Sequence, residues 1–358
     1  MRASAVDRIT EYAISAFLWG LRIVVVAVVV IGSFLTLTSG RYGMETWSSL
    51  VVSGLTTGSV YALIALGYTM VYGILRMINF AHGEIFMGGA FAGYFVGTMF
   101  ASIGLLSQGP LVILFAVAVM IVVAAAFSTV LALLVERIAY RPLRNAPRLV
   151  PLISAIGASY FLQYTFRGFL GAGIYVYPDV ALLGERVPID FLRLRWVDVL
   201  VVISAVAMMT GLYLFVMRTR MGTAIRAVSE DKSTAELMGI DVNRAIVTTF
   251  AVGAAMAGAA GVLYALLFDQ VFFFTGFVPG IKAFTAAVLG GIGNVPGAML
   301  GGLFLGQVES VGPTLFLDGF NVPSVNQLKD VIAFTLLVLV LVFRPSGILG
   351  ERVTTQRA

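Results

Sequence analysis

Residues 110–135 read PLVILFAVAVMIVVAAAFSTVLALLV, a stretch that contains no charged side chain. An α-helix needs about 20 mostly apolar residues to cross the hydrocarbon core of a bilayer. The strands of a membrane barrel are about half as long, so a run of this length excludes a barrel. The stretch is therefore a predicted transmembrane helix, and it decides the fold class.

Other apolar runs of similar length lie on both sides of this one, near residues 20–38, 48–72, 82–101, 150–170, 197–217, 246–268 and 327–343. The composition agrees with this pattern, because 59% of the 358 residues are hydrophobic and only 11% are charged, against about 25% charged in soluble domains. Lipid must therefore cover much of the surface. We predict an all-α integral membrane protein with about eight full transmembrane helices.

The segment GFVPGIKAFTAAVLGGIGNVPGAMLGGLFLGQVESV, residues 276–311, has a different pattern. Gly290, Gly291, Gly293 and Pro296 interrupt its apolar character, and glycine and proline break helices. Each of the two pieces is short for a full span. We expect a broken or re-entrant helix pair here.

Several chemical functions are excluded by what the sequence lacks. There is no cysteine and only one histidine, so no disulfide, thiolate nucleophile or multi-histidine metal site exists. We find no G-x-x-x-x-G-K-[ST] phosphate loop, no H-E-x-x-H and no G-x-S-x-G. The net charge of +5 is dispersed between apolar runs instead of forming a nucleic-acid-binding stripe. We predict no catalytic residue, no metal and no nucleic-acid partner.

The basic residues predict the orientation, because Lys and Arg gather in short cytoplasmic loops. They occur in 136–149, in 218–245 and near both termini, which places these parts in the cytoplasm and the loop 171–195 outside. Eight spans and a broken pair satisfy this parity. Arg2, Arg8 and Arg22, followed by the uncharged stretch Ile23–Leu37, also resemble a signal peptide, but no A-x-A-like cleavage site follows, which favours a retained helix.

The predicted cytoplasmic loop 218–245 has the pattern of two short amphipathic helices. Ser229 or Asp231 is the expected cap between them, and Gly239 the expected stop. Their apolar faces either dock a cytoplasmic partner or fold onto the protein itself, and the sequence leaves both open. These faces consist of Met221, Ile225 and Val228, then Ala235, Leu237 and Met238.

Five segments, taken in order, resemble the permeases of the branched-chain amino acid ABC importer family. They are GLTTGSVYALIALGYTMVYGILRMINFAHGEIFMGGA (54–90), YRPLRNAPRLVPLISAIGASYFLQ (140–163), RAVSEDKSTAELMGID (226–241), GIKAFTAAVLGGIGNVPGAMLGGLFLGQVE (280–309) and FRPSGILG (343–350). The resemblance covers about residues 47–350. It divides the chain into an N-terminal extension with an extra apolar helix (1–45), a permease domain (46–350) and a cytoplasmic tail (351–358).

The resemblance implies a permease subunit of an ATP-driven importer in the inner membrane, moving branched-chain or related amino acids by alternating access. Its partners would be two cytoplasmic ATPases, a paralogous second permease and an external solute-binding protein. ATP would be used by the ATPases, and this chain would bind no cofactor. Relatives also move urea or short amides, and an ion-coupled secondary transporter or channel is the rival class. The implied ATPase contacts are Arg226, Ala227, Glu230, Asp231, Ala235, Glu236 and Gly239.

Polar residues within the apolar runs are candidates for the translocation path or its gate, because such groups usually face a cavity. Asn79, His82 and Glu84 precede or begin the third run, where Asn79 and Glu84 alternatively cap a helix. Lys282 and Glu309 lie in the broken pair and either pair with each other or with Lys329 and Asp330, or contact substrate. Backbone exposed at the break is a further candidate, close packing being the alternative; the residues concerned are Gly290, Gly291, Gly293 and Asn294.

Overall fold

The structure is a computed structural model that describes residues 5–144, 146–147, 149–189, 193–344 and 346–350. Within these residues, eight helices have the length and composition to cross a membrane. Seven of the predicted apolar runs fall inside one of these helices, and the eighth, 327–343, falls inside the span Val325–Phe343, in which a 3-10 turn leads into α13. This agreement confirms the all-α polytopic fold. The eight helices are α1 (Ala5–Thr38), α2 (Met44–Leu75), α3 (His82–Ser102), α4 (Pro110–Val135), α5 (Leu149–Leu170), α7 (Trp196–Arg218), α10 (Val242–Phe268) and α13 (Lys329–Phe343).

Shorter elements connect these helices. Helices α6 (Ala181–Gly184), α8 (Arg220–Glu230), α9 (Lys232–Leu237), α11 (Phe277–Gly290) and α12 (Val295–Leu317) are accompanied by strands β1 (Tyr175–Val176) and β2 (Gln270–Val271). The two strands pair antiparallel, with Tyr175 opposite Val271. Turns of 3-10 helix cover Leu105–Ser107, Arg141–Leu143, Asp318–Phe320 and Val325–Leu328, and a π-helical turn covers Glu136–Tyr140. The predicted tail 351–358 and Arg2, Arg148 and Asp190 lie outside the described residues.

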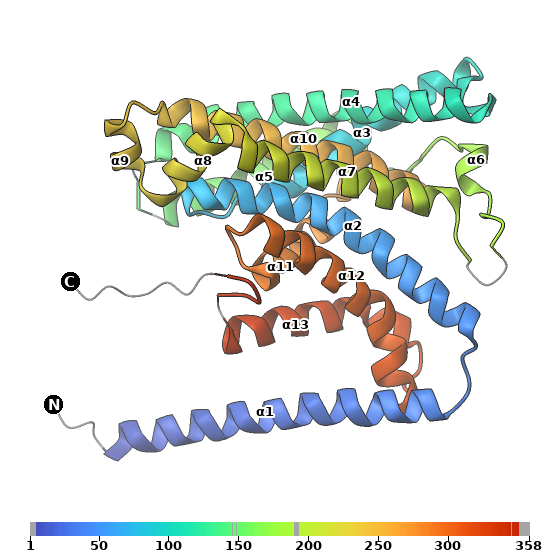
Figure 1. Cartoon of the computed structure of the whole chain (residues 1–358), viewed down its shortest axis with the longest axis vertical. Coiled ribbons are helices and arrows are strands. Elements are labelled where there is room, and N and C mark those ends of the chain that lie inside the picture. Colours follow the sequence, from blue (N-terminus) through green and yellow to red (C-terminus); the bar gives the residue numbers. More distant parts are fainter. Residues whose placement is uncertain (1–4, 145, 148, 190–192, 345, 351–358) are drawn as a thin grey trace.

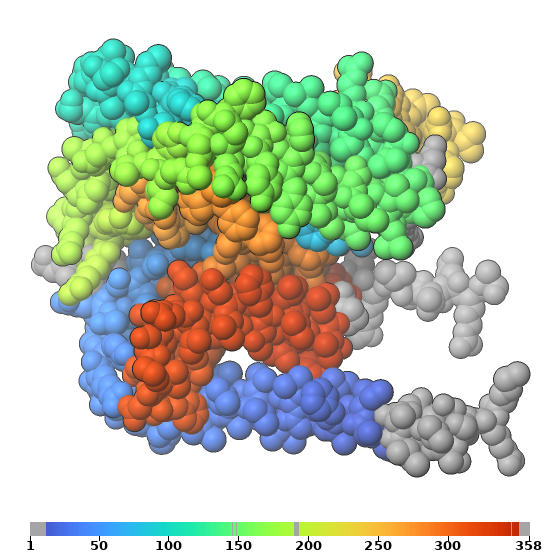
Figure 2. Space-filling model, turned by 180° about the vertical axis from the view of Figure 1, so that it is seen from behind, coloured from blue at the N-terminus to red at the C-terminus, as the bar shows by residue number. Residues whose placement is uncertain are grey.

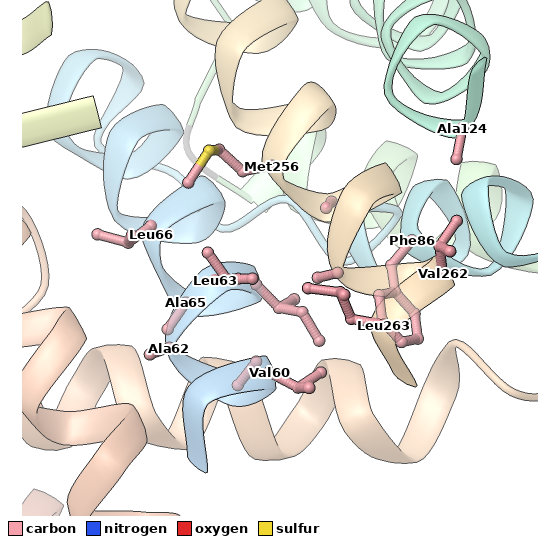
Figure 3. Packing of buried hydrophobic residues seen from close by; sticks show 14 of the residues in the cluster. Val60, Ala62, Leu63, Ala65, Leu66, Phe86, Ala124, Met256, Val262 and Leu263 are labelled. Carbon is pink, nitrogen blue, oxygen red and sulfur yellow. The ribbon is translucent and has the colours of Figure 1, made fainter. Parts of the chain in front are cut away.

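The core of the bundle is built around α2 and α10. In their most apolar stretches 67% and 78% of the residues are buried, against 0% in α1 and 11% in α13. Figure 3 shows Leu63 of α2, Leu263 of α10 and Phe86 of α3 converging in this core. The central helices are therefore shielded by protein, and the peripheral ones are left for lipid or partner subunits.

Small residues allow α2 and α12 to cross with their backbones in contact. A Cβ atom on Gly302 would overlap Ala62, and one on Gly306 would overlap Gly54 and Gly58. Close approach through small residues is the usual way in which membrane helices gain packing energy, since lipid is as apolar as their side chains. The glycines of α12 are thus packing positions.

This packing corrects one expectation about the broken pair. The break at 291–294 is present and α11 has only 14 residues, but α12 has 23 residues and is not a short piece. At about 1.5 Å per residue, α12 is long enough to span. The predicted interruption at Gly290, Gly291, Gly293 and Pro296 lies before or in the first turn of α12, and beyond that turn only Pro313 lies inside the helix as a helix breaker. In Figure 1 α12 bends toward α1 near its C-terminal end.

The loops separate into two groups at opposite ends of the bundle. The N-terminal end of α1 and the C-terminal end of α13 lie at the same end as α8 and α9, and the α6 region lies at the other (Figure 1). The predicted cytoplasmic segments therefore share one end, and the loop 171–195 lies at the opposite one. Which end faces the cytoplasm stays a prediction.

Helix α1 is attached to the bundle through its C-terminal part. The Thr36 hydroxyl accepts a hydrogen bond from the Gly319 amide at 2.9 Å and is only 2% exposed. A Cβ on Gly32 would overlap the Phe316 carbonyl, and the Arg22 guanidinium lies 4.2 Å from the centre of the Phe343 ring. Figure 2 shows an opening between α1 in blue and the red C-terminal helices. The extra helix thus docks at separate points instead of along its length.

Candidate translocation and coupling sites

The predicted pair of short helices is present as α8 and α9, joined at Asp231. The Asp231 carboxylate accepts hydrogen bonds from the amides of Ser233 at 2.9 Å and Thr234 at 3.2 Å, and from both hydroxyls. These bonds, the one from the Ser233 hydroxyl foremost, hold the pKa of Asp231 well below its usual range. Gly239 follows with φ +82°, a left-handed conformation that ends α9. The cap and the stop are those that the sequence indicates.

The apolar faces of this helix pair divide between two surroundings. Ile225, Val228 and Ala235 are buried against the chain itself, which corresponds to the self-packing interpretation. Leu237 and Met238 are 87% and 79% exposed, so the tip of α9 has no cover within the chain. Of the predicted ATPase contacts, Ala227 is half-buried and Ala235 buried, whereas the others are exposed: Arg226, Glu230, Asp231, Glu236 and Gly239.

Helices α8 and α9 are rigidly joined to the membrane-spanning helices. Thr219 caps α8 by accepting from the Gly222 amide at 3.0 Å, and a Cβ on Gly222 would overlap the last turn of α7. The Arg76 guanidinium, at the end of α2, donates to the Ser229 carbonyl at 3.0 Å. A displacement of α8 would therefore move α7 and the end of α2 with it.

The polar start of α3 differs from the predicted cap. The N-cap of α3 is Ala81, which makes no side-chain capping bond. The Asn79 side chain instead accepts a hydrogen bond from the Tyr140 hydroxyl at 2.7 Å. The interpretation of Asn79 as a helix cap is therefore wrong, because a long-range hydroxyl takes its oxygen. Glu84 does lie in the first turn of α3, where a negative charge complements the helix dipole.

Glu84 joins α3 to α5 inside the protein. Glu84 is only 1% exposed. Its Oε1 accepts hydrogen bonds from Gln163 Nε2 at 2.6 Å and from Ser159 Oγ at 3.2 Å. Ser159 and Gln163 are not among the predicted site residues. They are four residues apart in an apolar run, so they share one helix face, and that spacing was an available signal.

Glu84 also lines a groove of about 230 Å³ between the starts of α3 and α11 and one side of α5. Its other walls are mostly apolar, with Ser159, Tyr68 and Tyr160 as the residues that carry a hydroxyl. The lining residues are Tyr68, Phe80, Gly83, Glu84, Ile156, Ser159, Tyr160, Gly276, Phe277, Gly280 and Ile281.

His82 is buried beside this groove without lining it. Its ring lies edge-on to Tyr68, with ring centroids 4.8 Å apart, and packs over Gly67 of α2. Its Nε2 has no hydrogen-bond partner among the described residues. No group of three or more His, Asp or Glu side chains that could hold a metal occurs in the part of the chain that the structure describes.

Lys282 and Glu309 form the ion pair that the sequence suggests. Lys282 Nζ lies 2.7 Å from Glu309 Oε1 and 2.6 Å from Asp330 Oδ1, so one ammonium ties α11 to α12 and α13. The Tyr61 hydroxyl of α2 lies 3.3 Å from Glu309 Oε1. Lys329, the other suggested partner, is not part of this network. The arrangement favours packing over substrate contact, since each charge has an opposite charge beside it.

The helix break is closed by the C-terminal segment. The amides of Ile348 and Leu349 donate to the carbonyls of Leu289 and Gly290 at 2.8 and 3.1 Å. Asn294 caps α12 through the Gly297 amide and donates to the Leu349 carbonyl. A Cβ on Gly291 would overlap Gly350, and one on Gly290 would overlap Gly297. Gly290 and Gly291 are buried by this packing, while Gly293 is exposed.

A second groove, also of about 230 Å³, lies at the opposite end of the bundle. Hydroxyl groups from α2 line one wall, and the Arg195–Asp198 pair, 3.6 Å apart, lies on the other side. None of its residues is among the predicted site residues, although the hydroxyl side chains recur at helical spacing. They are Ser49, Ser53, Thr56 and Thr57.

Comparison with known proteins gives consistent matches. Residues 50–341 match the family described as the permease component of the branched-chain amino acid transport system. The chain is 47% identical over 305 residues to the high-affinity branched-chain amino acid transport system permease protein BraD of Pseudomonas aeruginosa, covering 84% of this chain and 95% of that one. It is 42% identical over 303 residues to LivH of Escherichia coli, covering 84% and 94%. The probable LivH of Methanocaldococcus jannaschii is 28% identical over 300 residues, covering 82% and 89%.

Proposed function

Because this chain belongs to the branched-chain amino acid permease family, we propose that it is the permease subunit of an ATP-driven importer for branched-chain or related amino acids. The observation that carries the proposal is the match over residues 50–341, which includes α8, α9 and the helix break. The ATPases are separate chains, and this chain holds no ATP. Urea and short amides are not favoured as cargo, since the relatives named above carry amino acid descriptions.

The proposed coupling element is the exposed surface of α8 and α9. Leu237 and Met238 are large apolar side chains left uncovered beside the charges of Glu230 and Glu236. An apolar contact rimmed by charges is the usual composition of a protein interface. Two cytoplasmic ATPases, one on this chain and one on a paralogous second permease, would supply movement through α8 to α7 and α2.

The proposed path leads from the hydroxyl-lined groove at one end toward the Glu84 groove. A solute-binding protein would deliver cargo outside, at the end that carries α6. Binding of ATP can drive the cycle only if the ATPases bind it with different affinity in the inward- and outward-open states. The termini and α8–α9 would face the cytoplasm of the inner membrane.

The test of the coupling element is co-purification of the ATPases with charge-altered variants. Gly239→Arg and Glu230→Arg should reduce the bound ATPase at least about tenfold, which corresponds to about 1.4 kcal/mol of binding free energy. Gly171→Arg is the matched control, because Gly171 has φ +85° against +82° for Gly239, has open space around it, and lies at the other end of the bundle. Undiminished ATPase on both variants would refute the assigned contact.

The absence of cysteine provides a direct test of orientation. Glu236 and Ile174 are both exposed and lie at opposite ends of the bundle. Each can be replaced by a single cysteine, and whole cells can then be treated with a thiol reagent that does not cross the membrane. We expect labelling at 174 and protection at 236. Concentrative uptake by this chain alone in liposomes would instead indicate an ion-coupled transporter.

A further inference from the structure

The groove between α3, α5 and α11 combines one buried carboxylate with an apolar wall. Its volume of about 230 Å³ lies below the range of about 300–1,000 Å³ typical of pockets for drug-sized ligands, so it suits a small metabolite. The apolar wall is formed by Ile156 of α5 and by Phe277 and Ile281 of α11. In Figure 2 the green residues of α5 border orange residues on the face that is shown.

The hydrogen bonds of Glu84 are distributed unevenly over its two oxygens. Both donors, Gln163 Nε2 and Ser159 Oγ, reach Oε1, whereas the buried Oε2 has no partner among the described residues. No Lys, Arg or His of the described chain lies within ion-pair distance of Glu84. A carboxylate that served only to join α3 to α5 would need neither its negative charge nor a vacant second oxygen.

Two helix starts meet at this carboxylate. The backbones of Gly83 in α3 and Gly276 before α11 are in contact, and a Cβ on either would overlap the other's carbonyl. A Cβ on Gly276 would also lie 3.0 Å from Glu84 Oε2, which places this oxygen beside the start of α11. The positive ends of both helices therefore stabilise negative charge at the groove.

From this arrangement we propose that the groove binds one α-amino acid in transit, with Glu84 Oε2 accepting hydrogen bonds from its α-ammonium group. The α-carboxylate faces the start of α11, and the aliphatic side chain lies against Ile156, Phe277 and Ile281. The inference rests on the proposed transport function and deepens it by assigning the recognition chemistry. It makes this chain, and not only an external binding protein, a contributor to selectivity.

An ammonium group fits these surroundings better than an inorganic cation. Metal cations of the alkali and alkaline-earth groups prefer a shell of several oxygens. Here the nearest polar neighbours, Gln163 Nε2 and Ser159 Oγ, act as donors toward Glu84, so their hydrogens point at the carboxylate. A single free carboxylate oxygen beside an apolar wall matches an ammonium on an aliphatic molecule.

The first experiment measures occupancy in the full chain without its partners. Because the chain contains no cysteine, Ile156→Cys introduces a single thiol at the groove, on a side chain that is 41% exposed. In nanodiscs, millimolar L-leucine should slow its reaction with a methanethiosulfonate reagent several-fold. The same concentration of 4-methylpentanoate, which lacks only the ammonium, or of sodium chloride, should not.

Ile153→Cys is the matched control, since Ile153 lies on the same helix, is 69% exposed and does not line the groove. Its labelling rate should not respond to leucine. Equal protection by leucine and 4-methylpentanoate would overturn the ammonium contact, and equal rates at 156 with and without leucine would overturn the site.

The second experiment removes the charge while keeping the shape. Glu84→Gln retains an acceptor oxygen for Gln163 and Ser159, and should abolish leucine protection at position 156. In the assembled importer it should lower leucine uptake at least about thirtyfold, the scale expected when one partner of a buried charge pair is removed. The amount of ATPase that co-purifies with the variant should stay near that of the wild type.

The proposed importer function and the proposed Glu84 site can be refuted by different results. If the ATPases do not associate with the wild-type chain, the proposed function is wrong, whatever the labelling shows. If the assembled wild type imports leucine and Glu84→Gln imports it equally well, the transporter assignment stands and the Glu84 site is wrong.

Discussion

Glu84 and Glu309 are both buried carboxylates in the membrane-embedded part of the chain, 1% and 7% exposed, and both lie beside α11. Lys282 lies 2.7 Å from Glu309 and binds Asp330 as well, so that region is a closed network of charges. Each carboxylate has one oxygen, Oε2, without a hydrogen-bond partner among the described residues, but the donors to Glu84 are all neutral. Burial of a carboxylate alone therefore does not indicate a functional residue, whereas burial without a counter-charge does.

The largest expected effect comes from removing the shared cation. Lys282→Met leaves two carboxylates without a counter-charge and should destabilise the protein by about 3–5 kcal/mol, the usual cost of breaking a buried ion pair. Thermal unfolding of the purified protein in lipid nanodiscs measures this. A loss of stability below about 1 kcal/mol, as for a surface ion pair, would show that the Lys282 network does not differ in this way from the surroundings of Glu84.

Neutralising the second partner should recover part of that loss. The double variant Lys282→Met with Glu309→Gln no longer buries an unpaired charge, and Asp330, whose side chain is 46% exposed, can be hydrated. We expect a favourable coupling of about 2 kcal/mol in a double-mutant cycle, within the range of about 0.5–3 kcal/mol for residues in contact. Strict additivity would indicate that Lys282 acts through Asp330 alone.

The equivalent change at Glu84 should be mild for stability. Glu84→Gln keeps an acceptor for both donors and should cost no more than about 1 kcal/mol, the net value of a typical hydrogen bond. Glu84→Ala leaves Gln163 without its acceptor and should cost about 1–3 kcal/mol. Both are measured by the same unfolding assay, and equal losses for Gln and Ala would show that the fold itself requires the charge.

A third carboxylate, Asp231, is exposed and extends the comparison to the surface, where we expect the smallest effect. Hydrogen bonds from Ser233 and Thr234 lower its pKa in the folded protein. A lowered pKa means that its contribution to α9 is complete at neutral pH and is lost only as the pH falls below the ordinary carboxyl value of about 3.9.

Amide hydrogen exchange at Ser233 and Thr234, corrected for the intrinsic pH dependence, should therefore be unchanged from pH 7 to about pH 4 and faster below it. Asp231→Asn is the control, because it retains a capping oxygen and does not titrate. Loosening of α9 already between neutral pH and about pH 5 would contradict the lowered pKa.

The helices and the two-ended arrangement were predictable because both depend on local sequence. A run such as 110–135 needs no knowledge of its neighbours to be a membrane helix. The cap at Asp231 and the stop at Gly239 are local in the same way, and the structure contains both. The length of α12 was underestimated, because a short second piece was expected after the break, whereas the helix continues for 23 residues with Gly302 and Gly306 packed against α2.

The partners of the buried polar residues were the least predictable feature. The Tyr140 hydroxyl donates to the side-chain oxygen of Asn79, and Ser159 and Gln163 donate to one oxygen of Glu84. In each contact the two residues are far apart in the sequence. The pairing of Lys282 with Glu309 was easier, because opposite charges in lipid-embedded segments have few alternatives. Neutral donors leave no such signature in a single sequence.

The closure of the α11 break by the C-terminal segment has a consequence for biogenesis. The carbonyls of Leu289 and Gly290 obtain their partners from Ile348 and Leu349, which leave the ribosome only after all of α12 and α13. The last turn of α11 therefore lacks these two hydrogen bonds while the later helices enter the bilayer. A nascent chain stalled before residue 348 should therefore remain a substrate for membrane quality control. Synthesis of Ile348 and Leu349 supplies the two missing donors.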